Sequence, residues 1–241
     1  MYRTTILTLI AIFSYSFAQA QLFQKIKKEV EKELPISNTS ELTQDDAAMG
    51  LKEALTIGIK KGVETVSKPD GYFKDPIIKI LMPDEAKAVE SKLRAIGQDK
   101  LVDDAIEAMN RAAEDAASGA LDLFVTAIKN LTIEDALAIL GGEEDAATQY
   151  LDRQTRNPLT EKFQPVIKSS LDKVNATKHW NAVFTAYNKI PFIKKVNPDL
   201  EAFVTEKAID GLFVQIAKEE KEIRENPAAR VTDILQKVFG N

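Results

Sequence analysis

The chain of 241 residues contains no cysteine and only one histidine, His179. Without cysteine it cannot form a disulfide framework, and it lacks the lipid-bearing cysteine that a bacterial lipoprotein places directly after its signal. One histidine cannot supply a His-Glu-x-x-His zinc site or the two Glu-x-x-His motifs of a di-iron bundle. The composition therefore disfavours transition-metal catalysis, and we expect neither a metal nor another cofactor.

Signatures of nucleophilic or nucleotide-dependent catalysis are also missing. Ser118 and Gly119 stand without the flanking residues of a Gly-x-Ser-x-Gly elbow. No phosphate-binding loop and no dinucleotide fingerprint occurs. His179 lies beside Trp180 in a helical pattern, which is more typical of a packed histidine than of a catalytic base. We therefore expect no catalytic residues and favour a protein that is not an enzyme.

Long hydrophobic runs are absent, so no segment reaches the roughly 20 apolar residues that cross a bilayer. One shorter apolar stretch, residues 6–17, follows a basic start at Arg3 and precedes the sequence Ala18-Gln19-Ala20. A short apolar core followed by small residues at alternate positions is typical of a cleavable export signal. We predict a signal peptide at 1–20, cleavage near Ala20 and a mature protein in the periplasm or outside the cell.

Acidic residues outnumber basic ones, 37 against 32, which gives the chain a net charge of −5. An acidic balance argues against nucleic acid or an anionic membrane as the main partner. With 44% hydrophobic residues, the chain can bury an ordinary apolar core. We expect a peripheral amphipathic helix and polar linker at 21–40, followed by a single all-helical domain at 41–241.

Apolar residues recur at spacings of three and four along most of the chain, which is the pattern of amphipathic helices. This pattern predicts an all-α fold, a multi-helix bundle of roughly eight to ten helices. At most one short extended segment is expected, at 76–82 between two prolines. Within the main domain the helices are expected at 44–66, 84–96, 99–130, 132–140, 143–154, 158–174, 178–188, 198–225 and 227–239.

Small residues repeat at a spacing of four in the first of these helices, at Ala54, Gly58 and Gly62. A glycine inside a helix costs about 1 kcal/mol relative to alanine. Close approach of a neighbouring helix would offset that cost, so the spacing predicts tight packing along this face.

Polar residues gather at two places in otherwise apolar helices. Asn110, Arg111 and Glu114 lie on the Ala-rich helix 99–130 and need partners if they are buried. Glu220 and Arg224 belong to a charged run near the C-terminus that continues to Arg230. This run is interpreted as a solvated face, as an ion network reaching Glu114 or Asp122, or as the floor of a ligand site.

A third candidate is the acidic stretch at 143–145, which leads into Thr148 and Tyr150. Carboxylates at a helix start are stabilising without any ligand, and the spacing lacks the alternating oxygens of an EF-hand loop. The candidate ligand-binding residues are Asn110, Arg111, Glu114, Thr148, Tyr150, Glu220, Arg224 and Arg230.

Several ordered motifs resemble the domain-of-unknown-function family 4197 of exported bacterial proteins. The motifs lie at 45–55, 109–114, 147–150, 205–213 and 223–230, and the resemblance spans residues 41–240. It implies a helical, signal-bearing envelope protein and supplies no catalytic residues. The segment 21–40 lies outside the resemblance.

The leading hypothesis is a non-enzymatic periplasmic domain that binds a small molecule or an envelope protein. Its pocket is expected between the Ala-rich helix and the C-terminal Glu/Arg run. The alternative is a carboxylate-based hydrolase or lyase of cell-wall glycans, which needs two acidic residues such as Glu114 and Glu220. A third interpretation treats residues 21–34 as an amphipathic anchor on a membrane surface.

Overall fold

The structure is a computed structural model that describes residues 43–189, 195 and 199–225. The chain divides into two units, Met1–Thr43 and Gln44–Asn241. The predicted signal peptide at 1–20, the helix and linker at 21–40 and the helix expected at 227–239 lie outside the described residues.

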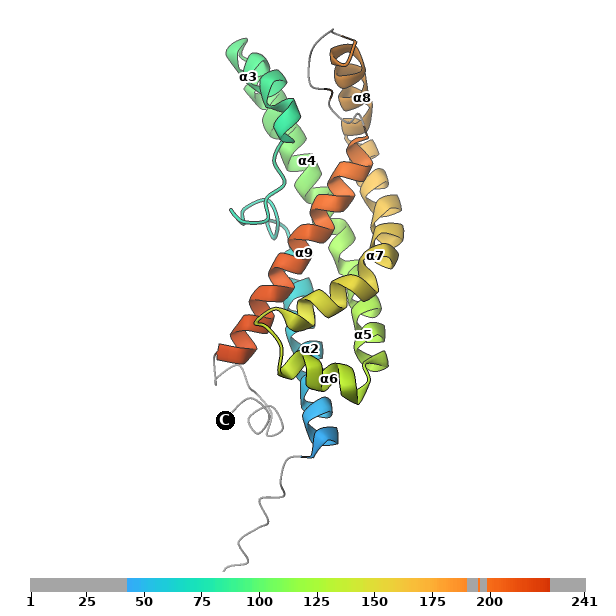
Figure 1. Cartoon of the computed structure of the whole chain (residues 1–241). Coiled ribbons are helices and arrows are strands. Elements are labelled where there is room, and N and C mark those ends of the chain that lie inside the picture. Colours follow the sequence, from blue (N-terminus) through green and yellow to red (C-terminus); the bar gives the residue numbers. More distant parts are fainter. Residues whose placement is uncertain (1–42, 190–194, 196–198, 226–241) are drawn as a thin grey trace, which may run out of the picture. The chain divides into compact units, whose positions relative to one another are not determined.

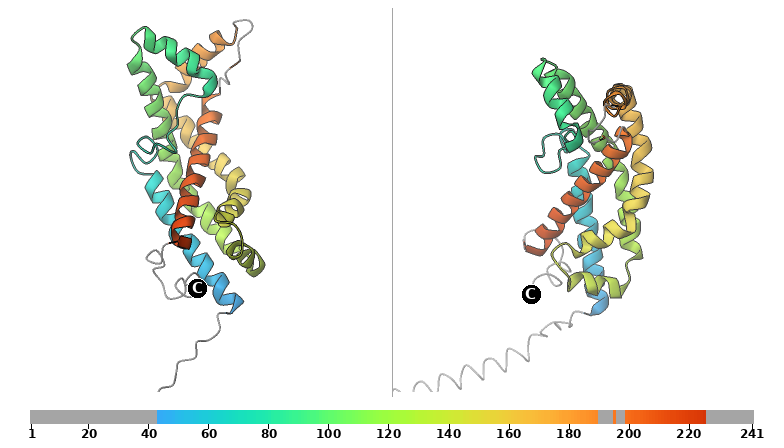
Figure 2. Two further views of the ribbon diagram at one scale, coloured as in Figure 1. Left: turned by 60° about the vertical axis from the view of Figure 1, so that its left-hand side comes forward. Right: turned by 45° about the horizontal axis from the view of Figure 1, so that its top comes forward.

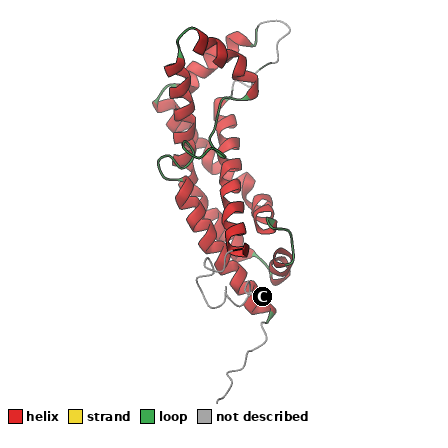
Figure 3. Ribbon diagram, turned by 90° about the vertical axis from the view of Figure 1, so that its left-hand side faces the viewer, coloured by secondary structure: helices red, strands yellow, loops and turns green. Residues whose placement is uncertain are grey.

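Helices and loops make up the described part of the chain, which contains no strand (Figure 3). The predicted all-α fold class is therefore confirmed. Residues 76–78 form a turn and 79–83 a loop, so the segment at 76–82 is irregular. The α-helices are α2 (Gln44–Val66), α3 (Lys87–Ala95), α4 (Asp99–Ala117), α5 (Leu121–Asn130), α6 (Ile133–Leu140), α7 (Ala146–Lys173), α8 (Ala176–Tyr187) and α9 (Leu200–Glu225), and the 3₁₀ turns are η1 (Asp84–Ala86) and η2 (Ser118–Ala120).

Helix α9 packs against α2, α4 and α7, and these four helices build most of the core (Figure 1). Figure 2 shows the C-terminal part of α9 beside α2 and the start of α9 near the end of α7. Val204, Ala208 and Leu212 on α9 are completely buried. Phe213 of α9 meets Phe124 of α5 edge to face, with ring centroids 5.7 Å apart. Apolar side chains on several sides of α9 are thus buried against different neighbouring helices.

The glycines of α2 face α9 at close range. A Cβ atom built on Gly58 would lie 3.0 Å from Ile223 Cδ1, and one on Gly62 would lie 3.5 Å from Glu219 Cγ. The distance at Gly58 is tighter than ordinary packing and the one at Gly62 is an ordinary van der Waals contact, so α9 lies close to α2, as the spacing of small residues predicts.

Helix α7 joins the two helices expected at 143–154 and 158–174, so the prediction of a break there is wrong. Pro158 and Pro165 lie inside α7. An internal proline removes one backbone hydrogen bond and strains the preceding turn, at a cost of about 3 kcal/mol. Apolar burial on both sides of Pro158 offsets this cost, and α7 changes direction along its course (Figure 1). The completely buried residues of this face are Leu151, Leu159, Phe163, Ile167 and Leu171.

The Ala-rich helix expected at 99–130 is interrupted by η2, which separates α4 from α5. The interruption coincides with Ser118 and Gly119, both weaker helix formers than the alanines around them. A Cβ atom on Gly119 would lie 3.2 Å from Lys162 Cε of α7, so α7 lies close to the chain at this turn.

Candidate functional site

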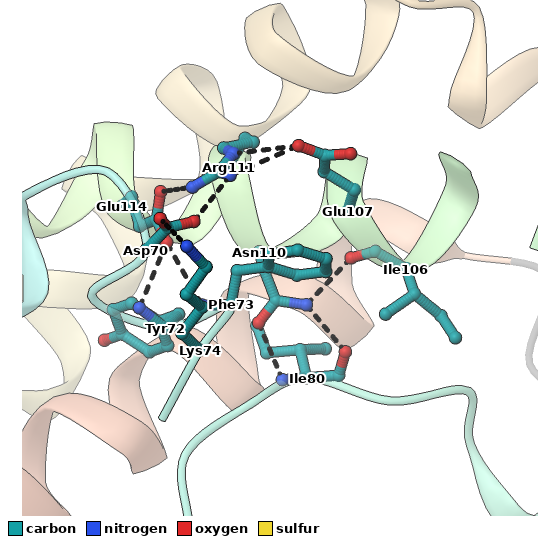
Figure 4. A network of polar contacts seen from close by, with 10 residues as sticks. All are labelled: Asp70, Tyr72, Phe73, Lys74, Ile80, Ile106, Glu107, Asn110, Arg111 and Glu114. Atoms are coloured by element: carbon teal, nitrogen blue, oxygen red, sulfur yellow. Dashed lines mark hydrogen bonds and ion pairs between the residues drawn. The ribbon is translucent and has the colours of Figure 1, made fainter. Parts of the chain in front are cut away.

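Asn110 of α4 binds the backbone of the loop between α2 and α3 (Figure 4). Its side-chain oxygen accepts from the Ile80 N–H at 2.8 Å, and its amide nitrogen donates to the Ile80 carbonyl at 2.8 Å. The same nitrogen donates to the carbonyl of Ile106 at 2.8 Å. Asn110 is completely buried, and it gives Ile80 the two hydrogen bonds that a neighbouring strand would otherwise provide.

Glu114 holds the start of the same loop, one turn further along α4. One carboxylate oxygen accepts from the backbone N–H groups of Tyr72 and Phe73, each at 3.1 Å. The other accepts from Arg111 at 2.8 Å. Glu114 is only 4% exposed, so this buried carboxylate is matched by hydrogen bonds and by a cation from its own chain.

Arg111 connects Glu114 to the loop and to the surface (Figure 4). Its guanidinium donates to Asp70 at 2.8 Å and to Glu107 at 3.2 Å, and it lies 5.2 Å from the centre of the Phe73 ring. Hydrogen bonds from Lys74 and then from Arg111 lower the pKa of Asp70.

Tyr72 fastens the loop to α9. Its ring is completely buried, and its hydroxyl donates to the Ala208 carbonyl at 2.6 Å. Burial raises the pKa of the Tyr72 phenol, so the hydroxyl stays protonated and remains a donor. A Cβ atom at Gly211 would lie 2.6 Å from Tyr72 Cε1, so only glycine leaves room for this ring.

A second buried cluster forms where Glu220 of α9 meets the start of α7. Its carboxylate accepts from the N–H groups of Ala147 and Thr148 at 3.0 and 2.8 Å, and from the Thr148 hydroxyl at 2.8 Å. Arg224 donates to Glu220 at 2.9 Å and to the Ile139 carbonyl at 2.9 Å. Glu220 therefore caps the N-terminus of α7 from another helix, where negative charge is favourable.

The sequence-predicted residues thus fall into two separate clusters. Arg224 pairs with Glu220, whereas Glu114 is bound by Arg111. Of the interpretations of the charged run, the one that joins Arg224 to Glu114 therefore does not hold, and the one that uses Arg230 lies outside the described residues. The C-terminal part of α9 lies beside the start of α7 and the end of α6, not beside the middle of α4.

Two other predicted residues stand apart from these clusters. Tyr150 packs half-buried against the core, and burial raises the pKa of its phenol. Arg230 lies outside the described residues, as does the side chain of His179. A ligand role for the predicted set stays a prediction.

A cavity of about 720 Å³ lies at the other end of the bundle, between α3 and α4 on one side and α7 and α8 on the other. Its volume is within the range of about 300–1,000 Å³ that is usual for ligand pockets. Apolar side chains form most of its wall: Met82, Ala86, Val89, Leu93, Leu101, Val102, Ala105, Ala108, Met109, Ala112, Val174, Ala176, Trp180, Phe184 and Leu200. The Ala-rich helix lines it as expected, but the second wall is not the C-terminal Glu/Arg run.

The polar residues of this cavity are mostly paired with neighbours. Asp115 accepts from the Ser170 hydroxyl at 2.7 Å, and both side chains line the cavity. The other acidic lining residues pair with basic ones: Glu90 with Arg94, Asp104 with Lys100, and Glu107 with Arg111. Arg111 is the one member of the predicted set among the lining residues of this cavity.

Two buried donors on α8 lack an acceptor in the described part of the chain, the Thr177 hydroxyl and the Trp180 Nε1–H. Trp180 is 6% exposed, lines the cavity and contacts the Phe184 ring at a tilt of 44°, with ring centroids 4.3 Å apart. Unpaired buried donors are rare in proteins. Their presence on a cavity-lining helix distinguishes this end of the bundle from the two fully paired clusters.

Sequence reasoning missed the cavity because its walls come from elements distant in the chain. The pairing of Trp180 with Phe184 at a spacing of four was the available signal, and it was interpreted only as packing around His179. Lys173 and Val174 gave no signal, since they become part of the wall only when the end of α7 approaches α4.

Two other kinds of site were sought in the described residues. They contain no group of three or more His, Asp or Glu side chains that could hold a metal ion. None of the helices described is long and apolar enough to cross a bilayer.

Fold and cavity together define an all-helical protein with a largely apolar hollow of ligand size. The family described as Protein of unknown function (DUF4197) matches residues 41–240, and the chain belongs to this family. The resemblance drawn from the sequence motifs is thereby confirmed. No curated protein and no solved structure matches the chain significantly.

Proposed function

We propose that this chain is a non-enzymatic binding protein that takes up an apolar small molecule in the cavity between α4 and α8. The cavity itself is the observation that carries the proposal, since it combines ligand-sized volume with a mostly apolar wall. We further propose that the segment 1–20 exports the protein, so that binding takes place in the periplasm or outside the cell.

The alkyl chain is the ligand chemistry that such a wall favours. Each methylene transferred from water to an apolar site contributes about 0.8 kcal/mol. Along α4 the lining runs from Leu101 to Asp115, which is about 21 Å at 1.5 Å per helical residue. Affinity should therefore rise with chain length until the ligand fills this span.

The alternative of a glycan hydrolase or lyase finds no support in the geometry of Glu114 and Glu220. Both carboxylates are about 5% exposed or less and already accept hydrogen bonds from backbone N–H groups. Neither lines the cavity. We therefore propose binding without catalysis.

Trp180 makes the proposal directly testable, because it is the only tryptophan of the chain and lines the cavity. Titration of the protein with octanol, decanol and dodecanol should change the indole fluorescence. The affinity should increase by up to about fifteenfold for each two methylenes. Fluorescence that stays unchanged with all three alcohols contradicts the proposal.

A matched pair of variants shows where the alcohol binds. Ala105→Phe places a large side chain in the cavity, and we expect it to weaken dodecanol binding at least about tenfold. Ala138→Phe adds the same side chain at an exposed position of α6 and should leave the affinity unchanged. Equal effects of the two variants would place the alcohol elsewhere.

A further inference from the structure

We propose that the ligand is a single-chain amphiphile with an anionic head, and that the Lys173 ammonium group binds this head. This inference rests on the proposed function, because the apolar cavity must first accept the tail. It adds the charge of the head group and the residue that recognises it.

Lys173 differs from the other charged residues of the cavity wall. The acidic residues there are bound to Arg94, Lys100, Arg111 or Ser170, as described above. For Lys173, no ion pair and no hydrogen bond of its side chain is found within the described ranges. Asp115 keeps its negative charge beside the neutral Ser170 hydroxyl, and Lys173 is the one cation of the wall without an acidic partner among the described residues.

Lys173 also lies where an amphiphile would leave the cavity. It is exposed, and it stands beside Val174, which is 57% exposed. Leu101 lines the opposite wall on α4 and is 47% exposed. An exposed apolar residue, Val174, next to a cation forms a boundary between an apolar interior and water, which is where the head of an amphiphile belongs.

A lysine suits this role because its ammonium group is a point charge on a flexible stem. It can reach a carboxylate or a phosphate without the fixed geometry that arginine requires. The shared chemistry is therefore an anionic head on one alkyl chain, and the two head groups are separate arms of the test. Net negative charge of the chain disfavours an anionic membrane surface. It does not oppose a single anion at this local cation.

The test compares dodecanoate, dodecyl phosphate, dodecanol and dodecylamine, each below its micelle concentration, with Trp180 fluorescence and calorimetry as readouts. Both anions should bind more tightly than dodecanol, and dodecylamine more weakly. Added salt should weaken the anions and leave dodecanol unchanged. The tighter of the two anions identifies the head group, carboxylate or phosphate.

Lys173→Gln removes the charge and leaves a polar side chain that is shorter by one atom. We expect about a fivefold loss of dodecanoate affinity with dodecanol affinity unchanged. Lys60→Gln changes an exposed lysine of α2 that does not line the cavity, and it should alter neither affinity. Thermal unfolding of both variants shows that they are folded, which matters because Lys173 also lies in the last turn of α7.

The outcomes separate the two proposals. If dodecanol binds as tightly as dodecanoate and Lys173→Gln has no effect, the anionic head is contradicted while the apolar binding site stands. If none of the four compounds binds, the binding function itself fails. A dodecanoate affinity that falls as protein concentration rises would show a second copy of the chain in the cavity, and would overturn the assignment to an amphiphile.

Discussion

Small residues of the helices have different surroundings at the two ends of the bundle. At the end formed by α2, α6, the start of α7 and the C-terminal part of α9, which we name the packed end, Gly58 and Gly62 receive side chains of α9. At the end formed by α3, α4, the end of α7 and α8, which we name the cavity end, Ala105 and Ala108 face a hollow of about 720 Å³. Small residues thus allow close contact between helices at the packed end, whereas they border an open cavity at the cavity end.

Polar groups follow the same division. Glu220 at the packed end is matched by backbone and hydroxyl donors from α7 and by the Arg224 guanidinium of α9. At the cavity end the Trp180 Nε1–H has no acceptor in the part of the chain that the structure describes, and Lys173 has no partner there. Within the described residues, the polar groups of the Glu220 cluster are all paired, whereas the cavity end combines apolar surface with unpaired donors, which is why we propose that it binds a ligand.

The largest effect should come from opening the Glu220 cluster at the packed end. Glu220→Ala leaves the N–H groups of Ala147 and Thr148 without their acceptor and leaves Arg224 without its carboxylate. Breaking such a buried pair costs about 3–5 kcal/mol, which urea unfolding would measure. Glu206→Ala on the exposed face of the same helix should cost less than about 0.5 kcal/mol. Similar losses for both variants would remove the special role of Glu220.

A leucine introduced at each end of the bundle should affect stability differently. Gly62→Leu pushes a leucine into the contact with Glu219 and Gln215, and it should destabilise the protein by about 2 kcal/mol. Ala108→Leu extends into the cavity, and it should change stability by less than about 0.5 kcal/mol. Thermal unfolding of both proteins decides this. A large loss for Ala108→Leu would show that the cavity end is as tightly filled as the packed end.

The smallest effect is expected at the capping box of α6, where Thr132 and Asp135 exchange hydrogen bonds. The Thr132 hydroxyl and then the Thr132 N–H lower the pKa of Asp135 in the folded state. Because the pKa is lower in the folded state, the ionised carboxylate stabilises the fold fully at a pH above the pKa of the unfolded state, about 3.9. This stabilisation is lost as the pH falls through the pKa of the folded state. Asp135→Asn should therefore lower Tm slightly at pH 7.

The pH series supplies the control for that prediction. As the pH falls through the lowered folded pKa of Asp135, the difference in Tm between the wild type and Asp135→Asn should shrink, because the carboxyl group becomes protonated in both states of the wild type. A difference in Tm that stays constant from pH 7 to pH 2 would show that the charge of Asp135 does not contribute.

Helix positions were predictable from the sequence because their signals are local. α2 begins directly after Thr43 and ends at Val66, as the apolar period and the turn at 68–71 indicate. The capped start at Thr132 was also readable. α7 was mispredicted because the sequence shows Pro158, whereas the compensating burial of Leu159 and Phe163 depends on neighbours from other elements.

The sequence indicated several residues of the polar clusters, but not the hydrogen-bond partners of these residues. Burial of Asn110 and Glu114 follows from their position among alanines, yet their partners at Ile80 and Tyr72 lie on a loop with no regular pattern. The cavity was the least predictable feature, since its wall is made of residues from several elements that are far apart in the sequence. Its walls can be recognised only after α4 and α8 are placed on either side of it.

The most direct measurement is a crystal structure of the full chain grown with dodecanoate. The account predicts an alkyl chain along the alanines of α4, beside Trp180, with its carboxylate at Lys173. Well-ordered side chains filling the space between α4 and α8, with dodecanoate absent from it or bound elsewhere, would contradict the account.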